Sequence, residues 1–417
     1  MTPRTALGGY LLVTLCYWAF TLSDGALRML VLLHLHDRGQ TAWALALVLI
    51  PYEVAGVVTN LLGGYLGARF GLRPTLSLGL LLQAAACAML AADAATLSVT
   101  YVAVTQVLSG VAKDLAKTSA KSYVKALQPT ADGARLFRWV AWLTGSKNTM
   151  KGLGFFAGGA LLAWIGFGPT NRWLAAALAG CAALAFVTLP RVAGRRGAAP
   201  LDVLRQDAAM GWLAAARVFL FGARDAWFAV AVPLFLVGRG WTPVEVGAFL
   251  AGWVVVYGVV QSQAPRLTQV SRPADGARLV ARWTAALLLP LLPAALLLPR
   301  GPDPTVVAAV ALCVFGGLFA VTSSLHSWLV VALHDDHRGP ERVGFYYAAN
   351  AVGRLLGTAL SGALFGAVAA HGDVDAGLAA CLYAACVAAC LAVACTSRLT
   401  RTLDSARASS SLFVSRR

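Results

Sequence analysis

Charged residues are scarce in this 417-residue chain: they make up 12% of it, whereas apolar residues make up 59%. Ordinary soluble domains carry about a quarter charged residues, so this composition argues against a soluble globular protein. Acidic residues are the scarcer kind, with 18 Asp and Glu against 34 Lys and Arg. The basic residues are scattered over short segments and form no single patch, which argues against a nucleic-acid partner.

Several marks of enzymes and secreted proteins are also missing. The eight cysteines all lie in apolar segments and match neither a disulfide framework nor a zinc spacing. We therefore interpret them as small apolar packing residues; thiolates converging on a soft metal or trivalent arsenic are the alternative. No nucleophile and base pair, phosphate loop or metal-ligand cluster is present, so we expect no enzymatic activity, no cofactor and no metal. The first apolar segment is too long for a cleaved signal peptide and contains Asp24 and Arg28.

Long apolar runs are abundant and predict an all-α, multi-pass membrane protein. Twelve runs approach membrane-spanning length. Their approximate limits are 9–35, 42–67, 74–92, 97–119, 136–165, 172–190, 211–238, 243–264, 279–299, 305–333, 343–370 and 376–396.

The distribution of Lys and Arg between the loops predicts the orientation. With both termini in the cytoplasm, cytoplasmic segments hold 22 Lys and Arg and outer loops hold four. Because basic residues are retained on the cytoplasmic side, this is the expected topology. Most of the net charge of +16 is then a topological signal.

The chain divides into two related halves. The polar segment 191–210 predicts a cytoplasmic linker between six-helix bundles 1–190 and 211–397, with a basic cytoplasmic tail at 398–417. Asp24 precedes Arg38-Gly39 by the same distance as Asp225 precedes Arg239-Gly240, an offset of 201. Gly56-Val57-Val58 and Gly258-Val259-Val260 also match, at an offset of 202. Two pseudo-symmetric six-helix halves resemble the major facilitator fold, which is associated with alternating access.

Charged residues inside the apolar runs are the main indication of function. Eight are basic and four are acidic, an excess of four positive charges. Twelve unpaired ionisable groups at the bilayer centre would cost roughly 30–40 kcal/mol, so they must pair, line a wet cavity or meet a ligand. The missing counter-charge is most simply an anionic substrate. The candidate substrate-binding bases are Arg28, Lys113, Lys117, Lys147, Lys151, Arg217, Arg224 and Arg354, and the candidate proton-coupling or counter-ion acids are Asp24, Glu53, Asp114 and Asp225.

The fourth and fifth spans carry the lysines. In the fourth, lysines recur every four residues from Lys113 to Lys125. Lys113 and Lys117 lie deep enough in the membrane to serve a substrate path, and Asp114 is placed to neutralise one of them. In the fifth, the stretch TGSKNTMKGLGFFAGG puts Lys147 and Lys151 on one face halfway across, followed by glycines that allow close helix packing.

The remaining candidates lie in four other spans. Asp24 and Arg28 are one turn apart and could pair within their helix, whereas adjacent Arg224 and Asp225 point about 100° apart and need not pair. Arg354 has no acid within a turn and lies near Asn350, which makes it the leading candidate for direct anion contact.

Two further ionisable residues have open roles. Glu53 is either a proton carrier for antiport or part of a salt bridge between helices. His326 is a further candidate near the inner end of its span.

The loop after the second span reads GYLGARFGLR and resembles the cytoplasmic signature of the major facilitator superfamily. Gly64 and Gly71 would permit a tight turn, while Arg69 and Arg73 could bind helix C-terminal carbonyls. We expect this loop to act in the conformational switch, although Ala68 stands where the signature has an Asp.

Five segments together resemble one family, the organoarsenical efflux permeases of the ArsJ type. They are YWAFTLSDGALRMLV (17–31), YEVAGVVTNLLGG (52–64), the lysine-rich fourth span, TGSKNTMKG and FLFGARDAWF (219–228). The resemblance implies a bacterial inner-membrane exporter of 1-arseno-3-phosphoglycerate that gives arsenate resistance. It also implies a functional partner, a glyceraldehyde-3-phosphate dehydrogenase that makes this compound, with no physical contact required.

Two alternatives stay open on the residues alone. An organophosphate or phosphonate carrier, or a phosphate antiporter, needs the same intramembrane Arg and Lys. A transporter-like membrane sensor would need no path through the protein. We expect a monomer in the lipid bilayer with a small anionic substrate.

Overall fold

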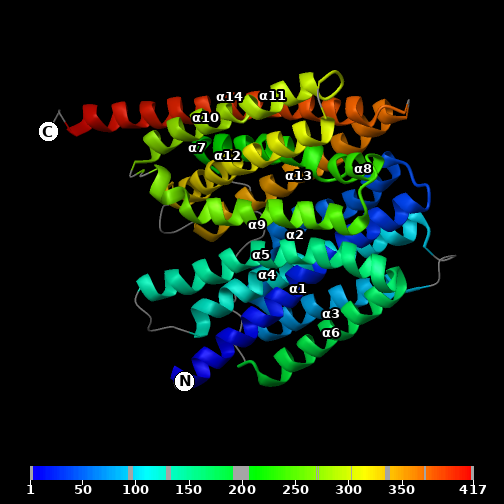
Figure 1. The fold of residues 1–417 in the computed structure, drawn as a ribbon. Coiled ribbons are helices and arrows are strands. Elements are labelled where there is room, and N and C mark those ends of the chain that lie inside the picture. The colour runs from blue at the N-terminus through cyan, green and yellow to red at the C-terminus, as the bar shows by residue number, and fades with distance from the viewer. Residues whose placement is uncertain are drawn as a thin grey trace. The chain divides into compact units, whose positions relative to one another are not determined.

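The structure is a computed structural model that describes residues 3–92, 97–127, 133–190, 206–268, 270, 272–301, 303–333, 339–370 and 372–414. Every regular element in these ranges is a helix (Figure 1). The helices are α1 (Pro3–Asp37), α2 (Ala42–Phe70), α3 (Leu72–Leu90), α4 (Val99–Leu127), α5 (Gly133–Ile165), α6 (Phe167–Thr188), α7 (Ala208–Phe228), α8 (Ala231–Gly238), α9 (Pro243–Thr268), α10 (Pro273–Ala286), α11 (Leu288–Leu297), α12 (Pro304–Ala332), α13 (Gly339–Ala369) and α14 (Val374–Val414).

A helix occupies each of the twelve predicted ranges. Within the described residues, ten helices are long and apolar enough to cross a membrane. Helices α4 and α5 are not among them, because their lysines and other polar residues lower their hydropathy. Two crossings consist of paired helices, α7 with α8 and α10 with α11. A count of twelve crossings and the cytoplasmic termini stay predictions.

The chain forms two compact units. The first comprises Met1–Pro200 and Gly240–Val255, and the second comprises Leu201–Arg239 and Val256–Arg417. The first half of α9 therefore groups with the first unit, where Gly247 lies against the backbone of Phe155 on α5.

In the first unit, α1 packs on α5 and α6, and α4 packs on α2 and α3. Glycines bring α1 and α5 together. A Cβ on Gly25 would lie 2.7 Å from the carbonyl oxygen of Lys151, and one on Gly158 would lie 2.6 Å from that of Ala26. This close approach places the middle of α5, which carries the predicted lysines, directly beside Asp24.

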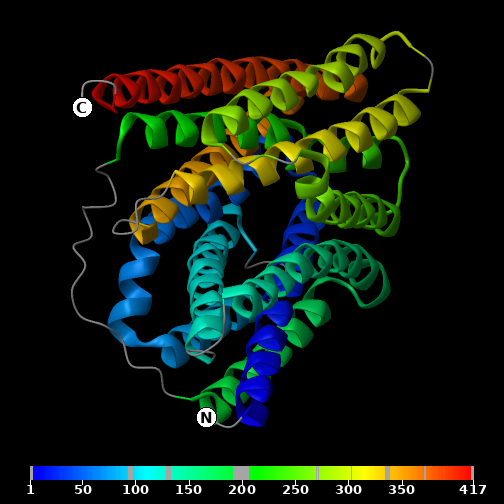
Figure 2. The same cartoon turned by 90° about the vertical axis from the view of Figure 1, so that its left-hand side faces the viewer.

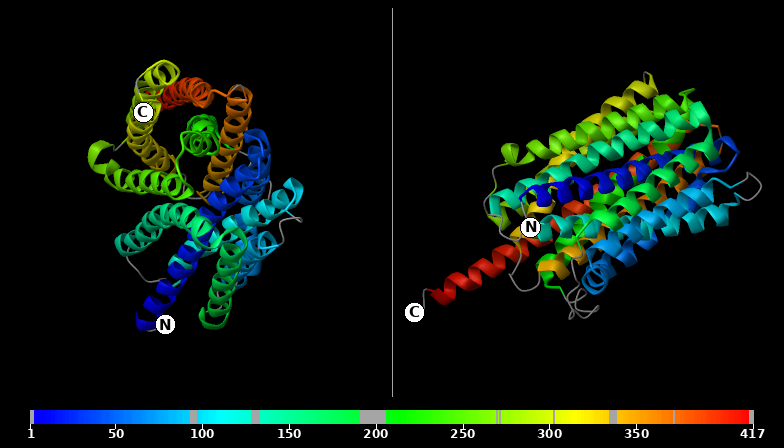
Figure 3. Two further views of the ribbon diagram at one scale, coloured as in Figure 1. Left: turned by 45° about the vertical axis from the view of Figure 1, so that its right-hand side comes forward. Right: turned by 90° about the horizontal axis from the view of Figure 1, so that it is seen from below.

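In the second unit, α7 is the central helix. It packs on α12, α13 and α14, which surround it in the left view of Figure 3. In the most apolar stretch of the span formed by α7 and α8, 83% of the residues are buried, against 33% in that of α6. Glycines again permit the closest contact: Gly353 on α13 lies against the carbonyl group of Val218 on α7.

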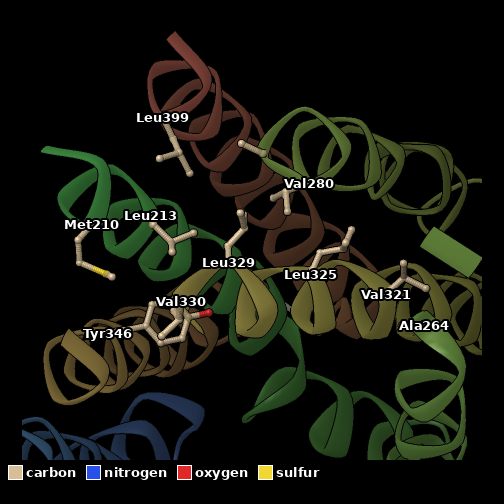
Figure 4. Close-up of a cluster of buried hydrophobic side chains, with 11 residues drawn as sticks. Met210, Leu213, Ala264, Val280, Val321, Leu325, Leu329, Val330, Tyr346 and Leu399 are labelled. Atoms are coloured by element: carbon tan, nitrogen blue, oxygen red, sulfur yellow. The ribbon is translucent and has the colours of Figure 1, made fainter. Parts of the chain in front are cut away.

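The apolar core of the second unit lies where α7, α10, α12 and α14 meet. Figure 4 shows its buried side chains, among them Leu213, Val280, Leu329 and Leu399. Leu399 belongs to this core because α14 continues to Val414, through most of the segment predicted as a cytoplasmic tail, and runs alongside α10 and α11 (Figures 1 and 2). The cytoplasmic position of that segment stays a prediction. Apolar burial, and an ion pair between Arg278 and Asp404, hold this extension on α10.

The sequence repeat has a structural counterpart in the turns. Gly39 and Gly240 both have positive φ, 78° and 85°, and each follows an Arg at the end of a helix. Two residues after each glycine, at Thr41 and Thr242, a threonine side chain accepts a hydrogen bond from a backbone N–H of the next helix. The two halves thus share the same helix-turn-helix connection.

Candidate functional site

An ion pair between Arg28 on α1 and Glu53 on α2 joins these two helices. An Nη2 of Arg28 donates to Glu53 Oε1 at 2.7 Å, and both side chains are buried. Asp24 instead accepts a hydrogen bond from the Tyr52 hydroxyl at 2.5 Å. Arg28 therefore pairs with an acid of another helix. Glu53 forms the salt bridge between helices that is one of its two predicted roles, and its role as a proton carrier stays a prediction.

Helix α5 brings Lys151 to the same acid. Its Nζ lies 4.0 Å from Asp24 Oδ2 and 5.7 Å from the centroid of the Phe155 ring. Ser146, one residue before Lys147, accepts a hydrogen bond from the Trp18 indole of α1 at 2.8 Å. The polar stretch of α5 therefore faces α1, a partner that the spacing of its lysines did not predict.

Helix α4 contributes a polar network with α2. Asp114 accepts hydrogen bonds from Lys117 at 2.5 Å, Thr59 at 2.7 Å and Asn60 at 3.1 Å. Lys117 also donates to the Asn60 carbonyl oxygen at 2.8 Å. The neighbouring Lys113 places its Nζ 4.1 Å from the centroid of the Tyr52 ring, a cation–π distance.

Gly56 on α2 makes room for this ammonium group. A Cβ on Gly56 would lie 3.0 Å from the Lys113 Nζ. Gly56 therefore lets the backbone of α2 approach α4 so closely that Lys113 and Lys117 both reach α2.

In the second unit, Asp225 is shared by two arginines. Arg224 Nε lies 2.6 Å from its Oδ1, and Arg354 Nε on α13 lies 3.3 Å from its Oδ2. The adjacent Arg224 and Asp225 do form an ion pair. Arg354 also has an acidic partner, which lies on another helix and so could not be found from the spacing within α13. The Arg224 guanidinium also lies 4.6 Å from the Phe221 ring centroid and 5.5 Å from that of Phe319.

Arg217 has neutral partners. Its Nε donates to the Asn350 side-chain oxygen at 2.9 Å and its Nη1 to the Ser323 hydroxyl at 3.2 Å. The guanidinium lies 4.0 Å from the ring centroid of Phe221 and 5.0 Å from that of Tyr346. It is 5% exposed, and no carboxylate lies within ion-pair distance of it in the described part of the chain.

The two units place a charge pair in the same way. Asp24 and Asp225, which the offset of 201 relates, lie on α1 and α7; each meets a base from the glycine-rich helix packed against it, Lys151 on α5 and Arg354 on α13. The repeat that the turns indicate therefore extends into the charged interior.

The predicted excess of positive charge divides evenly between the units. In the first, five of the predicted bases accompany three acids, and in the second, three accompany one. Each unit therefore holds an excess of two positive charges among these side chains, all of which the structure describes.

The structure describes the side chains of only part of the predicted switch loop. The α2 helix continues through Gly64 and Arg69, whose side-chain positions lie outside the described ones. Gly71 has a φ of 81° and separates α2 from α3. Arg73 donates to the Leu189 carbonyl at the end of α6, at 3.5 Å, which is the type of contact predicted for it.

Sequence reasoning did not single out the neutral members of these networks. Tyr52, Thr59, Asn60, Ser323 and Tyr346 each contact a predicted charge. Their polar atoms inside apolar runs were the available signal, but such residues also occur as ordinary helix packing residues. No group of His, Cys, Asp and Glu able to hold a metal ion is found among the described residues.

Two helical bundles that contain many membrane-length helices and carry buried charges are typical of a multi-pass membrane transporter. The sequence model of the Major Facilitator Superfamily matches residues 9–362, and the chain belongs to this superfamily.

Solved structures agree on the fold. A bacterial homolog of the human lysosomal transporter Spinster, in an inward-facing and occupied conformation, superposes with a TM-score of 0.70 at 13% identity, covering 94% of this chain and 96% of that chain. A structure concerned with substrate recognition in proton dependent oligopeptide transporters gives 0.72 at 14% identity, with coverage of 96% and 99%. No curated protein sequence matches.

Proposed function

We propose that this protein is a secondary active exporter of an anionic organoarsenical, 1-arseno-3-phosphoglycerate, which gives arsenate resistance by proton-coupled alternating access. The observation that carries the proposal is the excess of two positive charges among the partly or fully buried charged side chains of each unit. The substrate has a phosphate and an arsenate group, and such oxyanions need cationic donors rather than thiols. The arsenic in the proposed substrate and the outward direction of transport are inferred from the five segments that resemble the organoarsenical efflux permeases.

The proposal assigns roles to the charged side chains. Arg217, with Asn350, and the bases left in excess in each unit contact the anion, while the acids hold the remaining bases in position between transport steps. Burial of cations without equal carboxylate is costly in an empty protein and becomes favourable when an anion binds. We place the protein in the bacterial cytoplasmic membrane as a monomer, supplied with substrate by a glyceraldehyde-3-phosphate dehydrogenase.

The test of the substrate is arsenate accumulation in arsenic-sensitive cells that express the protein, with and without the dehydrogenase. Lower accumulation only with both proteins would identify the arseno-ester as the exported species. Unchanged accumulation with the protein present in the membrane would reject it and favour an organophosphate, phosphonate or phosphate exchanger, which uses the same donors.

The test of the site is a double variant, Lys147→Ala with Arg354→Ala, which removes one base from each unit. We expect normal membrane expression and loss of arsenic export. Arg278→Ala is the matched control, because Arg278 is also a helical arginine in an ion pair but is exposed. Export by the double variant equal to that of the control would reject the assignment.

A further inference from the structure

A buried histidine lies beside Arg217. His326 is three residues after Ser323 on α12, and Ser323 accepts a hydrogen bond from Arg217. Residues three apart share a helix face, so His326 lies on the side of α12 that faces Arg217, whose charge acts on it. The imidazole is 0% exposed, and neither ring nitrogen has a hydrogen-bond partner in the part of the chain that the structure describes.

The surroundings of His326 contain no acid among the described side chains. From α7 the charged group that acts on it is Arg217. Tyr346 of α13, with Tyr347 and Tyr257 near it, lies on the ring side of the same Arg217 guanidinium.

The other two neighbouring helices contribute no ionisable group. The face of α10 turned to α12 consists of Gly276, Ala277, Val280 and Thr284, whereas its arginines are exposed. Helix α11 has no ionisable residue. Arg217 is therefore the charge that decides whether His326 can hold a proton.

The intramembrane carboxylates are in a different situation. Asp24, Glu53, Asp114 and Asp225 each have a cationic partner in an ion pair. A proton on any of them would break that pair and leave a buried cation without its counter-charge, which is costly. An imidazole with two unused nitrogens has no such pair to lose.

We propose that His326 binds a proton together with an oxyanion that occupies Arg217, so that the proton leaves with the anion and the membrane potential, acting on the net negative charge that remains, drives export. Beside an unoccupied Arg217, a protonated imidazole would place two positive charges together in an apolar interior. An oxyanion on the guanidinium offsets the first charge and accepts a hydrogen bond from the new imidazolium N–H. This inference rests on the proposed transport function and adds to it the residue and the direction of proton coupling.

The first experiment measures proton binding without transport. Purified protein in lightly buffered detergent is titrated with sulfate, an oxyanion that does not titrate near neutral pH, and proton uptake is followed with a pH indicator. Wild type should take up about one proton per protein on binding sulfate, because one imidazole titrates. His326→Gln should take up none, and His34→Gln should match wild type.

His34 is a suitable control because its imidazole also lies in a membrane helix, stacked on Phe167 at 4.1 Å between ring centroids in the first unit. Proton uptake by His326→Gln equal to that of wild type, or no uptake by wild type, would overturn the inference.

The second experiment separates this inference from the proposed substrate. Everted vesicles receive the dehydrogenase with its substrates and arsenate outside, and both arsenic uptake and internal pH are recorded. Spontaneous hydrolysis of the arseno-ester inside the vesicles releases protons in both cases, so wild type should acidify the interior by about one proton more per arsenic accumulated than His326→Gln does. Equal acidification per arsenic in the variant would refute the histidine while the function stands. Sulfate-linked proton uptake without any arsenic accumulation would refute the substrate while the histidine stands.

Discussion

The charged interiors of the two units carry the same excess charge by different means. In the first unit, Glu53 and Asp114 each hold a cation within an ordinary ion pair, and Asn60 and Thr59 extend the network. In the second, three arginines accompany a single acid, and two of them, Arg217 and Arg224, lie against aromatic rings. Guanidinium groups are weakly hydrated and stack on rings, so they tolerate an apolar site that would strip an ammonium of its water. The second unit is therefore better suited to keep a cation available for an anion.

The largest effect should come from Arg217→Ala, which removes the guanidinium with neutral partners. We expect arsenic export to fall roughly 30-fold or more, because losing a desolvated charge contact costs about 2–5 kcal/mol. Arg217→Lys should restore little, since one ammonium cannot serve both Asn350 and Ser323 while stacking on Phe221. Transport in everted vesicles at equal protein level is the measurement. Near-normal transport by Arg217→Lys would mean that the charge alone matters.

Removal of the shared acid should mainly affect stability. Asp225→Asn leaves two partly buried guanidinium groups without their buried carboxylate, and loss of one partner of a buried pair costs about 3–5 kcal/mol. Glu53→Gln frees one arginine and should cost less. Asp375→Asn breaks the exposed pair with Arg239 and should cost about 0.2–1 kcal/mol. Thermal unfolding in detergent gives the order; equal losses in all three would contradict the distinction between the units.

A glycine pair tests how closely the helices of the second unit must approach. Gly353→Ala would push a methyl group into the backbone of Val218 and should destabilise the unit by about 1–3 kcal/mol. Gly317→Ala on α12 is the control, because nothing lies within 4 Å of its added Cβ. The control should gain up to about 1 kcal/mol of helix stability. Similar melting temperatures for both variants would show that α7 and α13 can move apart freely.

The smallest effects should come from exchanging the repeat-related bases. Arg354→Lys should lower transport by roughly tenfold, about 1.4 kcal/mol, because a lysine cannot replace the fork of donors. Lys151→Arg should change transport by less than about threefold, since Asp24 already has the Tyr52 hydroxyl as a second partner. A stronger loss from Lys151→Arg than from Arg354→Lys would reverse the comparison.

The positions of the helices were predictable from the sequence, but the partners of the charges were not. Apolar runs and loop glycines locate helices because both act locally. The partner of Arg28 depends on how α1 packs on α2. Arg28 therefore pairs with Glu53, 25 residues away, although Asp24 lies nearer along the chain. Arg217 meets Asn350 across 133 residues, a contact that only the tertiary arrangement of α7 and α13 creates. Helical spacing could predict which faces are charged, but not which faces meet.

The matching pairs Asp24–Lys151 and Asp225–Arg354 have a consequence for the history of the molecule. A feature found at corresponding places in both halves of a duplicated chain is older than the duplication. The ancestral half-length protein thus already held an acid on its first helix against a base on its fifth. The lysines that recur along α4 and the aromatic rings around Arg217 occur in one half each, so the two copies have diverged at these positions.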